Sequence, residues 1–185
     1  MTILHIDSSI NGENSVSRVL TRSIVDQLRA ADPRAEVITR DLASEPLPHL
    51  TLESFADTST VDEFLGADTV VIGAPMYNFT LPSQLKAWID RILIAGKTFS
   101  YSEAGPAGLA GDKRVIVAVS RGGFYDDASA LEHVETYLKG VLSFIGITPE
   151  FVHADGVNYG PEQREAGIAN GLAEVELLEF ERLAA

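Results

Sequence analysis

Three short segments of the chain carry residues whose types suit the binding of an anion or of a flat ring. The first, at residues 8–17, contains Ser9, Ser15 and Ser17 and leads into an expected helix. Serine hydroxyls beside the free N–H groups of a helix N-terminus form a cradle suited to a phosphate ester. The alternative is that Ser15 only caps the helix and the rest is a polar turn. The segment lacks the glycine and lysine spacing of a triphosphate-binding loop, so a monophosphate fits it better.

The second segment, A-P-M-Y-N-F at residues 74–79, directly follows an apolar strand pattern. It combines a thioether, two aromatic rings and an amide. A flat heteroaromatic ring can lie against such a loop, with Asn78 and backbone groups reading its polar edge. The alternative is that the side chains of Met76, Tyr77 and Phe79 only cover the end of the core.

The third segment, S-R-G-G at residues 120–123, places two successive glycines at the end of another apolar strand pattern. Glycines allow the backbone to approach a ligand closely. Their N–H groups can then face the edge of a ring on which negative charge accumulates during reduction. The alternative is an ordinary glycine turn, with Arg121 as a surface charge.

Strands and helices are expected to alternate along the whole chain. The apolar patterns predict strands at residues 2–7, 36–40, 69–74, 114–119 and 151–155. They predict helices at residues 15–31, within 51–66, and at 81–95, 128–145 and 161–183. Residues 98–111, rich in glycine and alanine, read as a small hairpin inserted between these elements.

This alternation predicts one α/β domain, residues 1–185, with a parallel sheet covered by helices on both faces. Five strands favour a flavodoxin-like three-layer sandwich with strand order 2-1-3-4-5 over the six-stranded dinucleotide fold. Ligands of such sheets bind beyond the carboxyl ends of the strands, near the point where strand order reverses. The three segments follow strands 1, 3 and 4, so they are expected to converge. A phosphate cradle, a ring-binding loop and donors for a reduced ring together describe FMN.

The amino-acid composition excludes some classes of binding partner and some kinds of redox chemistry. The chain has 14 Lys and Arg against 27 Asp and Glu, a net charge of −13, which disfavours binding to nucleic acid or to an anionic membrane surface. No cysteine is present, so any redox chemistry needs a bound cofactor. No signal peptide and no apolar run near the ~18 residues of a membrane span is visible, so a cytoplasmic location is expected. No metal site is predicted, because no metal-binding motif is formed by His5, His49, His133 and His153.

The chain resembles the bacterial FMN-dependent NADH:quinone oxidoreductases, also called azoreductases. Matching motifs run over nearly the whole chain. They are the serine loop at 9–17, A-P-M-Y-N-F at 74–79, S-Q-L-K at 83–86, T-F-x-Y at 98–101, G-P-x-G-L at 105–109, S-R-G-G at 120–123, F-I-G-I-T at 144–148 and Y-G-P-E at 159–162.

The resemblance implies a homodimer with FMN bound non-covalently in each subunit near the interface. Phosphate contacts are implied for Ser9, Ser15, Val16 and Ser17. Ring contacts are implied for Met76, Tyr77, Asn78, Phe79, Ser120, Arg121, Gly122 and Gly123. Tyr101 and Phe144 are implied to line the acceptor pocket, one of them contributed across the dimer. The implied activity is ping-pong hydride transfer from NADH or NADPH, through the flavin, to quinones and to aromatic azo compounds, which are cleaved. No side chain is assigned as a catalytic acid or base.

Two other functions fit the same fold. A flavodoxin-type electron carrier would have no substrate of its own, but the threonine-rich phosphate loop of flavodoxins is absent. A phosphoacceptor receiver domain would need an aspartate at the end of strand 3, where Ala74 and Pro75 stand. The chain also departs from the resembled family in two places. Residues 42–67 look shorter, and residues 124–127 read F-Y-D-D where relatives often have a histidine.

Overall fold

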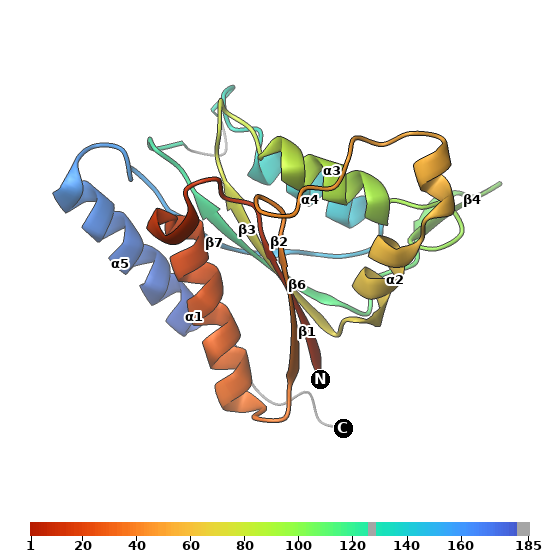
Figure 1. Ribbon diagram of the computed structural model, residues 1–185, viewed down its shortest axis with the longest axis horizontal. Coiled ribbons are helices and arrows are strands. Elements are labelled where there is room, and N and C mark those ends of the chain that lie inside the picture. Colours follow the sequence, from red (N-terminus) through yellow and green to blue (C-terminus); the bar gives the residue numbers. More distant parts are fainter. Residues whose placement is uncertain (126–128, 181–185) are drawn as a thin grey trace.

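A five-stranded parallel sheet forms the middle layer of the protein (Figure 1). The computed structural model describes residues 1–125 and 129–180. The sheet strands are β1 (Thr2–Asp7), β2 (Glu36–Asp41), β3 (Thr69–Pro75), β6 (Arg114–Ser120) and β7 (Glu150–Ala154). Their order is β2-β1-β3-β6-β7. Strands β4 (Phe99–Ser102) and β5 (Gly105–Gly108) form the separate antiparallel hairpin that the sequence predicts. Counted within the sheet, the order is 2-1-3-4-5, and the prediction is confirmed.

Helices cover both faces of this sheet (Figure 1). One face carries α1 (Val16–Ala31) and α5 (Pro161–Leu177), which pack against each other. The opposite face carries α2 (Ser59–Gly66), α3 (Ser83–Ile92) and α4 (Glu135–Phe144). Short 3-10 helices at Gly12–Asn14 and Glu53–Ala56 complete the connections. No helix among the residues that the structure describes combines the length and the apolar character needed to cross a bilayer.

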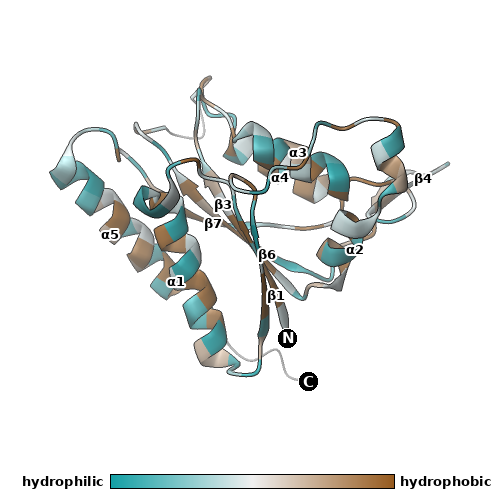
Figure 2. Ribbon diagram, viewed as in Figure 1, coloured by the Kyte–Doolittle hydropathy of each residue, from teal (hydrophilic) through white to brown (hydrophobic). Residues whose placement is uncertain are grey.

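Two hydrophobic cores, one on each face, explain the unbroken apolar runs of the central strands. Successive strand side chains point to opposite faces. Val70 and Ile72 of β3 therefore join the core under α2, α3 and α4, whereas Val71 joins the core under α1 and α5. Both faces of the central strands are buried, and Figure 2 shows these strands and the inner sides of α1 and α5 as hydrophobic.

Three helices are shorter than predicted. Helix α3 begins at Ser83 and ends at Ile92, within the predicted range 81–95. Helix α4 begins at Glu135, whereas the apolar spacing predicts a start at residue 128, which lies outside the described residues. Residues 129–134 instead form a turn, because the Glu132 carboxylate accepts hydrogen bonds from the N–H groups of Val134, Glu135 and Thr136 and so caps the helix. Helix α5 ends at Leu177 and residues 178–180 leave the helix, whereas residues 181–183 of the predicted helix lie outside the described residues.

Candidate functional site

The three predicted segments meet at the carboxyl edge of the sheet, at the top of the view in Figure 1. The Tyr77 hydroxyl lies 3.0 Å from Ser9 Oγ and accepts a 3.2 Å hydrogen bond from the Ile10 N–H. The Met76 N–H donates a 2.8 Å hydrogen bond to the Ser120 carbonyl. The serine loop is thus bonded to the Met-Tyr-Asn-Phe turn, and that turn is bonded to the glycine turn. The predicted convergence of the three segments is confirmed.

The serine loop ends in a capped helix N-terminus. Ser15 Oγ accepts a 3.2 Å hydrogen bond from the Arg18 N–H, and it lies 3.1 Å from Ser17 Oγ. Both serines are buried. The N–H groups of Val16 and Ser17 belong to the first turn, where an α-helix supplies no carbonyl partner. Ser15 is therefore a helix cap, as one of the two interpretations of the sequence predicts. It also lies beside the N–H groups of Val16 and Ser17, which can donate to an anion.

Arg18 fixes the serine loop through hydrogen bonds. The sequence analysis did not predict this role. Arg18 Nη2 donates to the Ser9 carbonyl at 3.1 Å and to Asp41 Oδ1 at 2.8 Å. Burial by itself raises the pKa of Asp41, but the hydrogen bonds from Arg18 and from the Ala43 N–H outweigh it and hold that pKa below its ordinary value. The pair remains charged at neutral pH and ties the loop to the end of β2.

The Met-Tyr-Asn-Phe turn has a strained backbone. The Tyr77 N–H donates to the Thr80 carbonyl at 2.8 Å, and the Thr80 N–H donates back at 3.1 Å. Between them Asn78 and Phe79 have φ values of 48° and 70°. Asparagine tolerates this left-handed region, but phenylalanine rarely adopts it, because its Cβ approaches the carbonyl. Such strain, retained at a strand end with Phe79 exposed, is typical of a binding site.

The glycine turn requires its glycines for a close approach between segments. A Cβ on Gly122 would lie 2.5 Å from Nδ2 of Asn158. The Gly122 carbonyl accepts a 3.1 Å hydrogen bond from the Asn158 N–H, and the Gly123 carbonyl accepts one from Gly156 at the same distance. Asn158 was not predicted to belong to the site. It directly precedes the Y-G-P-E motif, which is the signal that could have found it.

Arg121 is buried within a cluster of acidic side chains. Its Nε and Nη2 form a two-point ion pair with Asp155 at 2.6 and 2.9 Å, and Nη1 lies 3.9 Å from Glu132 and 3.8 Å from Glu135. Burial lowers the pKa of Arg121, but the hydrogen bonds that Arg121 donates to Asp155, together with the charges of Asp155, Glu132 and Glu135, raise it above its ordinary value. The interpretation of Arg121 as a surface charge is therefore wrong. The guanidinium group of Arg121 is bound to Asp155. Only the backbone of Arg121 is therefore available for the predicted contact with a ring.

Tyr101 and Phe144, the predicted acceptor-pocket residues, lie elsewhere in the chain. Both pack on Phe99, with ring centroids 5.5 and 4.8 Å away respectively. Strand β4, which carries Tyr101, projects at the right-hand edge of Figure 1, away from the three loops. Tyr101 is 71% exposed. A single chain thus does not bring these two residues to the loops. Residues 126 and 127 of the F-Y-D-D stretch lie outside the described residues.

Comparison with known proteins assigns the family. Residues 1–178 match the model of a family with a flavodoxin-like fold. FMN-dependent NADH:quinone oxidoreductase 2 of Bradyrhizobium diazoefficiens is 54% identical over 193 residues, which cover 93% of this chain and 96% of the relative. The FMN-dependent NADH:quinone oxidoreductase of Rhizobium meliloti is 56% identical over 190 residues, which cover 91% of this chain and 92% of the relative. This chain belongs to the family of FMN-dependent NADH:quinone oxidoreductases.

Solved structures of azoreductases are similar to the structure of this chain. The azoreductase AzrA superposes with a TM-score of 0.85 and 32% identity, covering 95% of this chain and 97% of the other. An azoreductase from Bacillus anthracis gives a TM-score of 0.83 and 31% identity at the same coverage. The alignment with the Bradyrhizobium oxidoreductase spans 193 positions, more than the 185 residues of this chain, so that relative has residues that this chain lacks. The placement of the missing residues within 42–67 stays a prediction.

Proposed function

We propose that this protein binds FMN non-covalently at the three joined loops and transfers hydride from NADH to quinones and to aromatic azo compounds. The observation that carries the proposal is the bonding of all three loops to one another, through Tyr77 to Ser9 and through Met76 to Ser120. The names of the curated relatives support FMN and NADH, and the azoreductase neighbours support azo acceptors.

The residues present fit FMN. The N–H groups of Val16 and Ser17, with the hydroxyls of Ser15 and Ser17, suit its phosphate. Asn78 and the strained backbone around it suit the polar edge of the ring. The backbone N–H groups of Gly122 and Gly123 suit a ring edge that gains negative charge during reduction. Bound FMN supplies the hydride acceptor and donor, which no side chain can replace. The chain itself binds and orients the cofactor.

We also propose that the protein is a homodimer located in the cytoplasm, in which the hairpin and its Phe99 cluster face the loops of the partner chain. Tyr101 of the hairpin and Leu109, which directly follows β5, are exposed at 71% and 48% in one chain, and Phe79 at the loops is exposed at 44%. Tyr101 and Phe144 share one cluster, so both would reach the acceptor from the same chain. NADPH as an alternative donor stays a prediction.

The absorbance spectrum of the purified protein is the first test. Flavin bands are expected, and denaturation should release FMN rather than FAD. Addition of NADH without oxygen or acceptor should bleach these bands, and addition of a quinone should restore them. A colourless protein that does not take up added FMN would contradict the proposal.

Turnover separates this proposal from the electron-carrier alternative. The protein alone, with NADH and a quinone, is expected to turn over continuously. A carrier would bind flavin and yet show no steady-state NADH oxidation without a partner protein. The names of the curated relatives favour the enzyme over the carrier.

A further inference from the structure

The loop that follows β7, at residues 155–158, holds the glycine turn from one side. The Arg121 N–H donates a 2.9 Å hydrogen bond to the carbonyl of Ala154, the last residue of β7. In return, the carbonyls of Arg121, Gly122 and Gly123 accept hydrogen bonds of 3.2, 3.1 and 3.1 Å from N–H groups of the β7 loop. Three consecutive carbonyls of the turn therefore point toward this loop.

This pattern also sets the direction of the N–H groups of the turn. The C=O and the N–H of one trans peptide unit point in opposite directions, and these peptides are trans. The N–H groups of Gly122, Gly123 and Phe124, here called the donor row, therefore point away from the β7 loop. Strand β6 lies between β3 and β7, so the side away from β7 is the side of β3 and of the Met-Tyr-Asn-Phe turn. The donor row is thus directed at the place proposed for the ring of FMN.

The ion pair of Arg121 with Asp155 connects the side chains of the turn and of the β7 loop. The Arg121 side chain is 6% exposed, and its Nε and Nη2 donate to the two oxygens of Asp155. The carboxylates of Glu132 and Glu135 lie 3.9 and 3.8 Å from Nη1, beyond hydrogen-bond distance. Asp155 therefore fixes the position of the guanidinium group, and the two glutamates are alternative partners on the side of α4.

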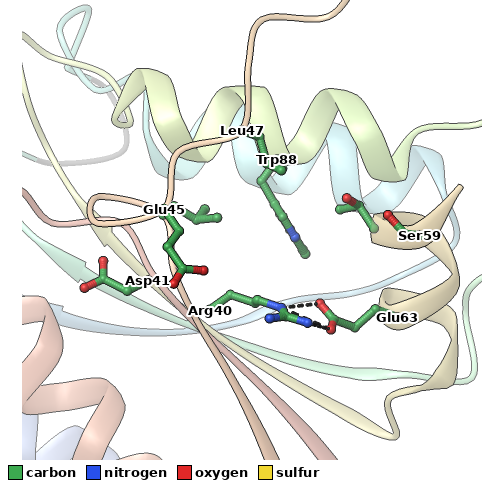
Figure 3. Close-up of a pocket in the computed structure, with 9 residues that line it drawn as sticks. Arg40, Asp41, Glu45, Leu47, Ser59, Glu63 and Trp88 are labelled. Atoms are coloured by element: carbon green, nitrogen blue, oxygen red, sulfur yellow. Dashed lines mark hydrogen bonds and ion pairs between the residues drawn. The ribbon is translucent and has the colours of Figure 1, made fainter. Parts of the chain in front are cut away.

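Burial distinguishes this ion pair from a pair at the surface. Arg40 and Glu63 form a similar pair at the wall of a cavity of about 260 Å³, which Trp88 also lines (Figure 3). The Arg40 side chain is 49% exposed, so water can solvate it when the pair opens, and such pairs contribute little. Buried Arg121 lacks this access to water. A displaced Asp155 leaves its charge uncompensated unless the turn moves toward another carboxylate.

We propose that Asp155 is a positioning residue, which holds the donor row in place through its ion pair with Arg121. This inference rests on the proposed binding of FMN. Donors directed at a ring edge that gains negative charge favour the reduced cofactor over the oxidised cofactor. A displaced donor row should therefore weaken the binding of reduced FMN more than that of oxidised FMN, which lowers the reduction potential of the bound cofactor.

Two variants change the geometry of the ion pair and conserve its charge. Arg121→Lys keeps the cation but cannot form the two-point contact, and Asp155→Glu moves the carboxylate by one methylene group. The reduction potential of FMN is measured in the FMN-saturated proteins by spectroscopic titration against reference dyes. The ratio of the affinities for reduced and oxidised FMN should fall about 3–10-fold, the effect of one hydrogen bond. For a two-electron couple this fall lowers the potential by about 15–30 mV.

Arg114→Lys is the matched control. Arg114 and Glu150, the first residues of β6 and β7, form the same two-point pair at 2.7 and 2.9 Å, at the opposite end of these strands. This variant should keep the wild-type potential even where its melting temperature falls. Asp155→Glu covers the case in which Arg121→Lys does not fold. An unchanged or higher potential in either test variant, or an equal fall in Arg114→Lys, would overturn the proposal. A wild-type protein that does not bind FMN would instead contradict the proposed function.

Discussion

At the residue scale, single hydrogen bonds connect the segments of the candidate site. The Tyr77 hydroxyl is the contact between the serine loop and the Met-Tyr-Asn-Phe turn, because it pairs with Ser9 Oγ and with the Ile10 N–H. These partners are 68 and 67 positions away along the chain. A contact of this kind positions both the phosphate-binding and the ring-binding part of a mononucleotide site.

Removal of this hydroxyl should weaken FMN binding. Tyr77→Phe breaks both hydrogen bonds and leaves the ring in place, so FMN affinity, measured by fluorescence titration of the apoprotein, should fall about 3–10-fold. The control is Tyr137→Phe, the same chemical change on α4, where the hydroxyl group is hydrogen-bonded to Lys86 and not to the serine loop. Equal FMN affinity in wild type and Tyr77→Phe would show that the two loops hold their positions without this contact.

Gly122 should not tolerate a side chain. In Gly122→Ala the new Cβ would meet the Asn158 amide at 2.5 Å, and overpacking of this kind costs about 1–3 kcal/mol. The melting temperature should therefore fall, and Asn158→Ala in the same chain should restore part of the loss. Gly140→Ala is the matched control, because no atom lies within 4 Å of its Cβ position and it lies in α4. A melting temperature unchanged by Gly122→Ala would refute the close approach.

At the scale of the element, the start of α4 connects the glycine turn to the helix layer. The Glu132 carboxylate caps the helix through three N–H groups and lies 3.9 Å from Arg121 Nη1. Burial raises the pKa of Glu132, but the hydrogen bonds from the N–H groups of Glu135, Thr136 and Val134 outweigh this and lower it. The cap therefore needs a charged carboxylate.

Acid should weaken this cap. A carboxyl group whose pKa is lower in the folded state stabilises the fold at pH values above its pKa in the unfolded state. This stabilisation is lost as the pH falls through the pKa of the group in the folded state. Glu132→Gln should reduce the free energy of unfolding by about 1–2 kcal/mol at pH 7. The difference from wild type should shrink as the pH falls below about 4. Urea unfolding at both pH values measures it, with the exposed Glu176→Gln as control. A difference independent of pH would contradict the role of charge.

The whole molecule presents its hairpin and its loops at separate places on one chain. Phe99, Tyr101 and Phe144 form one aromatic cluster, and the three loops lie at the carboxyl edge of the sheet. A second chain is the simplest means of bringing the cluster to the loops. The proposed homodimer follows from this separation together with the exposure of Tyr101.

Light scattering should give twice the chain mass of 19.9 kDa. If the partner's hairpin lines the acceptor pocket, Tyr101→Ala should lower kcat/KM for a quinone about tenfold, the effect of losing one aromatic contact, while FMN content stays unchanged. Leu177→Ala, at an exposed position on α5, is the control. A monomer with full quinone activity would contradict this arrangement.

The sequence by itself determined the order of the elements and the meeting of the three loops. Apolar runs fix which segments are strands, and strands alternating with helices leave a parallel sheet whose carboxyl ends share one edge. The boundaries of a helix differ from the prediction where a side chain competes with the apolar pattern. Glu132 delays α4 to Glu135, and no apolar spacing records that choice.

Only the tertiary structure decided the contacts between distant residues. Arg18 reaches Asp41, Gly122 makes room for Asn158, and Arg121 turns to Asp155 rather than to solvent. The cavity beside Trp88 likewise depends on how α2 and α3 pack against the end of β2. Each of these depends on side-chain direction and on packing between segments, which periodicity along a chain does not encode, because it records only which face of an element is buried.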